Sequence, residues 1–63
     1  MVHKLATGWT LVMGGVTYTV TGATRKRGQM CYLLTDAQGQ RQALEHKRLL
    51  EGQRDQWLQV QVD

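Results

Sequence analysis

Apolar and polar residues alternate along several short stretches of the chain, and this period of two is typical of strands with one buried face. The alternation is clearest in Val16–Thr21, where valine and tyrosine are interleaved with three threonines. Such β-branched and aromatic residues favour strands. A shorter apolar run, Trp9–Met13, precedes this stretch, and Gly14 and Gly15 lie between the two. Because two glycines can both take the positive φ of a tight turn, we expect a β-hairpin.

Three further strands are expected downstream. Met30–Thr35 is apolar on both faces, so the sequence leaves open which face is buried. Asp36–Gly39 matches a type I turn closed by a left-handed glycine, and it predicts that Gln40–Leu44 pairs back on the third strand. The last stretch, Trp57–Val62, alternates again and places its even-numbered residues on one apolar face.

The connections are expected to be short. Gly22–Gly28 is polar and predicts a loop. Glu45–Glu51 has helical composition, but it spans barely two turns, so we expect a single helical or 3₁₀ turn that Gly52 ends as a cap. No proline-rich or linker-like segment divides the chain, which indicates one domain over residues 1–63, with residues 1–7 as a flexible N-terminal arm.

Four meandering strands, a helical turn and a fifth strand define the predicted order of elements. An open five-stranded meander would leave exposed edges, which small β domains avoid by curling. The pattern therefore predicts an all-β, five-stranded barrel. The order of elements resembles that of the SH3-like small barrels, including the short helical turn before the last strand. Such a resemblance concerns the fold and implies no function by itself.

A second resemblance lies in the rhythm Leu-x-x-Gly-Gly-x-x-Tyr-x-Val, followed by Leu-x-Asp-x-x-Gly and Leu-x-x-x-x-Leu. The residues that carry it are Leu11, Gly14, Gly15, Tyr18, Val20, Leu34, Asp36, Gly39, Leu44 and Leu49. This pattern is similar to small β-barrel segments of bacteriophage Mu-type transposases and other mobile-element proteins. The resemblance implies a free-standing accessory barrel encoded by a phage or mobile element.

Size argues against an enzyme. The chain has 63 residues, and a domain of this length buries only about 60% of its unfolded surface, which leaves little room for a substrate cavity. Cys31 is the only cysteine, which excludes an internal disulfide, and with His3 and His46 it makes a poor zinc ligand set. We expect no catalytic site, metal or cofactor, an inert buried Cys31, and a packing or capping role for His46. Association into a homo-oligomer is an open route to stability.

The positive net charge of the chain favours a polyanionic partner such as nucleic acid. Eight lysines and arginines stand against five acidic residues, giving a net charge of +3. Arg25, Lys26 and Arg27 form the densest cationic cluster, and three such side chains can contact adjacent phosphates. The secondary candidates for nucleic-acid binding are Arg41, Lys47 and Arg48. The simpler interpretation of the triplet is a solvated hairpin tip.

The tryptophans leave two interpretations open. If the even-numbered residues of the last strand face the core, Trp57 is exposed, where it can stack on bases or anchor a protein interface. Alternatively, Trp57 closes one end of the barrel. The leading hypothesis is a non-catalytic nucleic-acid-binding or nucleoprotein accessory domain. The alternative is an adaptor or inhibitor that binds a host protein through Trp57 and Trp9.

No segment predicts contact with a membrane. No apolar run approaches the ~18 residues needed to cross a bilayer. The first residues lack the apolar region of a signal peptide. One unpaired cysteine fits a reducing compartment, so we expect a cytoplasmic protein.

Overall fold

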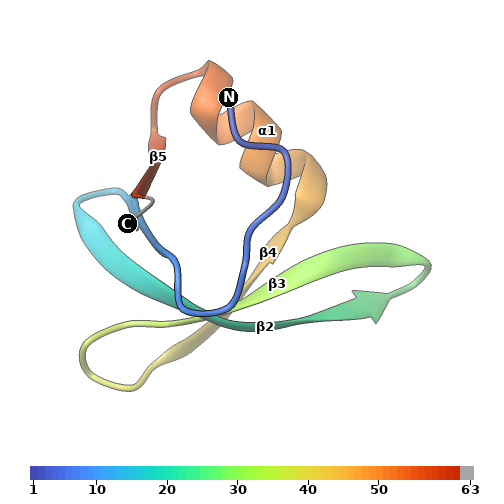
Figure 1. The fold of residues 1–63 in the computed structure, drawn as a ribbon, viewed down its shortest axis with the longest axis horizontal. Coiled ribbons are helices and arrows are strands. Elements are labelled where there is room, and N and C mark those ends of the chain that lie inside the picture. The colour runs from blue at the N-terminus through green and yellow to red at the C-terminus, as the bar shows by residue number, and fades with distance from the viewer. Residues whose placement is uncertain (62–63) are drawn as a thin grey trace.

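The computed structural model describes residues 1–61, whose strands and helix follow the predicted order. The elements are β1 (Thr10–Met13), β2 (Val16–Lys26), β3 (Gln29–Thr35), β4 (Arg41–Glu45), α1 (His46–Arg54) and β5 (Leu58–Gln61). All five strands join one antiparallel sheet in the order β4-β3-β2-β1-β5, which confirms a mostly β fold (Figure 1). Val62, which the sequence assigns to the last strand, lies outside the described residues.

The sheet is not closed, so the predicted barrel is not confirmed. Strands β4 and β5 are its two edges, and among residues 1–61 they do not pair with each other. Helix α1 follows β4, leads to β5, and packs against β3, β4 and β5. The helix, rather than a ladder between β4 and β5, therefore connects the two ends of the sheet around the core.

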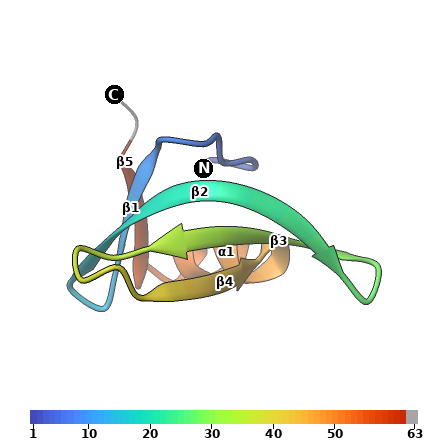
Figure 2. The ribbon, with the colours of Figure 1, turned by 90° about the horizontal axis from the view of Figure 1, so that it is seen from below.

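Strand β2 curves strongly and serves both halves of the sheet (Figure 2). Its first residues pair with β1, and the stretch from Thr19 to Lys26 pairs with β3. A bulge between Val20 and Gly22 interrupts the second ladder, and bulges bend a strand and increase its twist. Because of this bend, β1 and β5 run at a steep angle to β3 and β4 (Figure 2). The bent sheet encloses the core.

The polar segment Gly22–Gly28 is not the predicted loop. Its first five residues continue β2, and Arg25 and Lys26 pair with Met30 and Gln29. Only Arg27 and Gly28 form the connection, with φ values of 52° and 76°. A two-residue turn allows two strands to pair up to their ends, so polar composition did not end the strand here.

The other two hairpin turns confirm the sequence prediction. Gly14 and Gly15 have φ values of 57° and 80°, the left-handed conformation that a two-residue hairpin turn requires. In the turn between β3 and β4, the Asp36 carboxylate accepts hydrogen bonds of 2.9 Å from the backbone N–H groups of Gln38 and Gln40. Aspartate favours turns for this reason.

The core consists of apolar side chains from all five strands and the helix. Its fully buried members are Leu11, Val20, Tyr32, Leu34, Leu44, Leu49 and Leu58. They settle which face of β3 is buried, because Tyr32 and Leu34 are 2% and 1% exposed whereas Leu33 is 38% exposed. Cys31 is also buried, as predicted, although its register places it on the face opposite to Tyr32.

Helix α1 is longer than the single turn that the sequence predicts, and Gly52 is not its cap. The helix has nine residues and continues through Gly52, which is buried. It ends where Gln56 takes the left-handed conformation, with φ of 67°, and the Trp57 N–H donates to the Gly52 carbonyl at 3.0 Å. This is a Schellman cap, which glycine usually forms. Burial of Leu49 stabilises a helix that would be marginal alone.

The N-terminal segment, residues 1–7, lies beside α1 (Figure 1). The Gln53 amide holds it at one point, since the Val2 N–H donates to Gln53 Oε1 at 2.9 Å and Gln53 Nε2 donates to the Val2 carbonyl at 2.7 Å. Leu5 packs against the core. The segment therefore contacts the body of the domain, and its flexibility stays a prediction.

Candidate nucleic-acid interface and an adjoining cavity

Three of the predicted cations surround one hollow at the end of the β2–β3 hairpin. Lys26 ends β2, Arg27 lies in the turn and Lys47 is the second residue of α1, yet all three line a depression of about 720 Å³. We call this depression the basic hollow. Its remaining lining residues are Gln29, Cys31, Ala43 and Glu45. Pairing of Lys26 with Gln29 and of Cys31 with Glu45 places these side chains on one face of the sheet.

The basic hollow carries an excess of unpaired positive charge. Among residues 1–61, the two salt bridges join Arg48 to Glu51 and Arg54 to Asp55, so Lys26, Arg27 and Lys47 take part in neither. All three side chains are exposed, and Glu45 is the one carboxylate among the described residues that line the hollow. Free and clustered cations of this kind attract phosphate groups.

The other three predicted cations lie elsewhere. Arg25 pairs with Met30, so it lies on the opposite face of the hairpin from Lys26. Arg41 lies at the far end of β4, beside a separate depression of about 450 Å³. Arg48 faces another part of the molecule, where its guanidinium bonds to Glu51 at 2.7 Å and lies 4.7 Å from the centre of the Trp57 ring.

Neither tryptophan is fully exposed. Trp57 immediately precedes β5, is half-buried, and packs against the core beneath Arg48. Trp9 is also half-buried and packs against the same core. Both rings keep part of their surface in solvent, but both pack against the core. For Trp57 this packing is closer to the alternative interpretation, in which its ring covers one end of the core.

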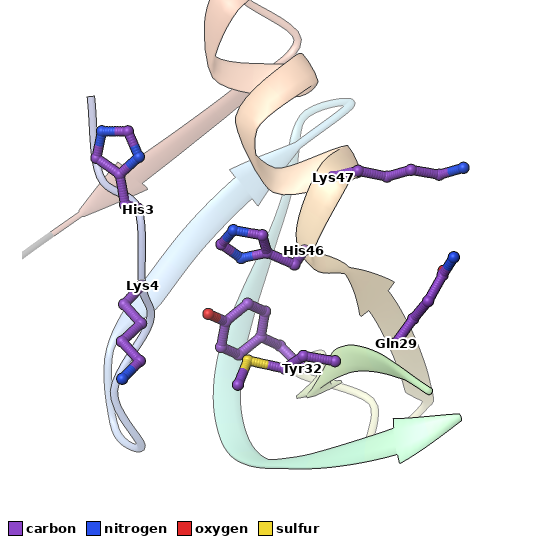
Figure 3. A pocket seen from close by; sticks show the side chains of 7 residues that line it. His3, Lys4, Gln29, Tyr32, His46 and Lys47 are labelled. Atoms are coloured by element: carbon purple, nitrogen blue, oxygen red, sulfur yellow. The ribbon is translucent and has the colours of Figure 1, made fainter. Parts of the chain in front are cut away.

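A second cavity, of about 490 Å³, lies between the N-terminal segment, β3 and the first residues of α1 (Figure 3). We call it the tyrosine cavity. It is lined by His3, Lys4, Gln29, Met30, Tyr32, His46 and Lys47. In Figure 3 the Tyr32 hydroxyl and the His46 ring point towards the segment that carries His3 and Lys4. The Tyr32 and His46 ring centres are 6.4 Å apart.

Two polar atoms at this cavity have no hydrogen-bond partner among the described residues. They are the Tyr32 hydroxyl and His46 Nδ1, and both are buried. Leaving a buried polar group unpaired costs about 1–3 kcal/mol, so such atoms are uncommon in folded proteins. The expected packing role of His46 accounts for the ring but not for its unpaired nitrogen.

Sequence reasoning missed the tyrosine cavity for a simple reason. Lys4, Tyr32 and His46 come from three separate segments, and no local pattern relates them.

Among residues 1–61, no helix is long and apolar enough to cross a membrane. The same part of the chain has no group of three or more metal-ligating side chains.

Comparisons with protein-family models, with curated proteins and with solved structures find no match for this chain. The resemblance to accessory barrels of Mu-type transposases therefore stays a prediction.

Proposed function

We propose that the chain is a small nucleic-acid-binding domain whose basic hollow holds the phosphate backbone. The observation that carries this proposal is the meeting of Lys26, Arg27 and Lys47 around one depression, without salt bridges among the described residues. The three positions come from a hairpin and a helix that the fold brings together. Phosphate contacts supply most of the affinity in sequence-independent binding, and they need only such a cluster.

The backbone of Arg27 supports the proposal. Its φ of 52° lies in the left-handed region, where asparagine or glycine is favoured in a two-residue hairpin turn. An arginine there costs roughly 1 kcal/mol of backbone strain relative to a favoured residue. Local strain of this kind is concentrated at functional sites. We infer that Arg27 is kept for its charge and not for the turn.

A longer nucleic-acid strand could extend from the basic hollow across the neighbouring surface of the sheet. Ala43 lines both the basic hollow and the depression beside Arg41, so the two adjoin on the outer face of β3 and β4. Thr21 and the exposed Leu33 line the second depression. Nucleic acid that crosses this face would meet cations at both ends and small or apolar side chains between them. Arg41 is then the second phosphate contact region.

We also propose the architecture that this function uses. The bent sheet and α1 together form an SH3-like small barrel in which the helix fills the gap between the unpaired edges β4 and β5. Three or four phosphate contacts give weak, salt-sensitive binding. A homo-oligomer would raise the avidity of such an accessory domain, since linked sites bind together.

The experiment is a fluorescence anisotropy titration of labelled 20-nucleotide single strands and duplexes at 50 and 200 mM salt. Three phosphate contacts predict a log–log salt slope of about −2.1 for single strands and about −2.7 for duplexes, so that affinity falls roughly 20- to 40-fold over this range. The variant Arg27→Asn/Lys47→Gln removes two of these cations while keeping a favoured turn residue. We expect its slope to be about 1.5 smaller in magnitude.

The matched control is Lys4→Gln/Arg54→Gln, which removes the same charge from two residues that do not line the basic hollow. It should retain most of the binding and the slope. Equal losses in both variants would assign binding to net charge and contradict the proposed site. Absence of binding at 50 mM salt, together with retention of a specific host protein by the Arg27→Asn/Lys47→Gln variant, would favour the protein-interaction alternative.

A further inference from the structure

The tyrosine cavity has the features of a small-ligand site beside the basic hollow, with which it shares Gln29 and Lys47. Its volume of about 490 Å³ falls within the range of small-molecule sites, about 300–1,000 Å³. Its walls include the Met30 side chain and the Tyr32 ring, and most of its surface is apolar. An apolar cavity of this size fits a ligand with an aromatic or aliphatic body.

Tyr32 supplies a directed polar group at this cavity. The residue is 2% exposed, and its hydroxyl has no partner among the described residues. His46 Nδ1 is buried and unpaired in the same way. Figure 3 shows the Tyr32 hydroxyl and the His46 ring directed towards the N-terminal segment. Two unpaired polar atoms on residues that line one cavity offer hydrogen-bonding capacity that a ligand can satisfy.

The charges around the cavity favour an anion. Lys4 and Lys47 line it with His3 and His46, and no aspartate or glutamate among residues 1–61 does so. The cavity also borders the start of α1, where the helix dipole is positive. Glu45, the residue at the N-cap, makes no side-chain capping bond, and the first turn holds no acidic residue. At the N-cap and first turn, only the Glu45 carboxylate therefore offsets the positive end of the helix, and it lines the basic hollow rather than this cavity.

We propose that the tyrosine cavity binds a small organic carboxylate, with an apolar body against Met30 and Tyr32. The Tyr32 hydroxyl donates to one carboxylate oxygen. His46 donates to the other from Nδ1, in the tautomer that carries its proton there. Lys4 and Lys47 provide the charge that attracts the ligand. Lys47 also lines the basic hollow, whereas Tyr32 and His46 line only this cavity. The variants Tyr32→Phe and His46→Leu therefore test the carboxylate site without removing any cation proposed to bind phosphate.

The test is a titration of the whole chain with benzoate, followed by ¹H–¹⁵N and aromatic NMR, with benzamide as the uncharged match. Benzoate should shift the resonances of Tyr32, His46 and Met30, and benzamide should bind about tenfold more weakly or not at all. Tyr32→Phe removes only the hydroxyl, and we expect it to weaken benzoate about tenfold, as for one lost hydrogen bond to a charged group. Tyr18→Phe is the control and should bind benzoate as the original chain does.

A second variant, His46→Leu, keeps the proposal testable if Tyr32→Phe fails to fold. It should also weaken benzoate while the dispersion of its NMR spectrum shows a folded domain. The proposal is overturned if benzamide binds as tightly as benzoate, because the cavity then recognises only apolar surface. It is equally overturned if folded Tyr32→Phe and His46→Leu bind benzoate unchanged, or if the shifts lie away from this cavity.

Discussion

Gly52 lies inside helix α1, where Leu58 and Trp57 pack directly against the helix backbone. A Cβ atom at this position would lie 2.7 Å from the Leu58 Cβ and 3.0 Å from two atoms of the Trp57 ring, Cη2 and Cζ3. The Leu58 Cβ is fixed to the backbone of β5 and cannot rotate away. The substitution Gly52→Ala therefore tests whether the helix needs glycine for close approach.

The expected magnitude is a difference between two effects. In an exposed helix interior, alanine in place of glycine stabilises by about 1 kcal/mol. Overpacking of a closed core costs typically about 1–3 kcal/mol, and here both β5 and the Trp57 ring must move. The contact at 2.7 Å places the cost towards the upper end of that range. We expect a net loss of about 1–2 kcal/mol, within the total stability of roughly 3–9 kcal/mol for a domain of this size.

The measurement is thermal and urea unfolding followed by circular dichroism. For a small domain each kcal/mol shifts Tm by roughly 4–8 °C, so the midpoint should fall by roughly 4–16 °C. Tryptophan fluorescence should also change, because displacement of the Trp57 ring alters its contact with Arg48. Lys47→Ala, an exposed substitution in the same helix, is the control and should be close to neutral. An increase in Tm for Gly52→Ala would refute the close-packing explanation.

Two further predictions concern single polar groups. Tyr32→Phe should leave the ligand-free domain as stable as before or stabilise it by up to about 1–3 kcal/mol, since it removes an unpaired buried hydroxyl; clear destabilisation in urea would show that this hydroxyl is already hydrogen-bonded. The hydrogen bond from the Arg54 guanidinium lowers the pKa of the Asp55 carboxyl in the folded protein. The stability that this pair contributes is therefore present above the pKa that Asp55 has in the unfolded chain, and it is lost as the pH falls through the lowered pKa of the folded state. An NMR titration of Asp55 should show this lowered pKa and its return towards the ordinary value in Arg54→Ala; equal values in both would contradict the pairing.

Local pattern determined the strands and two of the hairpin turns. In Val16–Thr21, alternation alone predicts a strand, because side chains of a strand point to opposite faces in turn. The glycines at positions 14 and 15, and the Asp36 carboxylate, predict turns through their own backbone and side-chain chemistry. These features depend on neighbours in sequence, and they were therefore predictable.

Contacts between distant segments decided the rest. At Gly52 the helix packs so closely against Leu58 and Trp57 that only a residue without a side chain fits there. No local pattern in the sequence shows this contact. The bulge beside Gly22 bends β2 instead of ending it, and so carries Lys26 and Arg27 to the start of α1. The sequence by itself determined which residues are strand-forming, apolar or charged. Only the tertiary structure decided which of them share a surface, because burial and charge clustering depend on positions far apart along the chain.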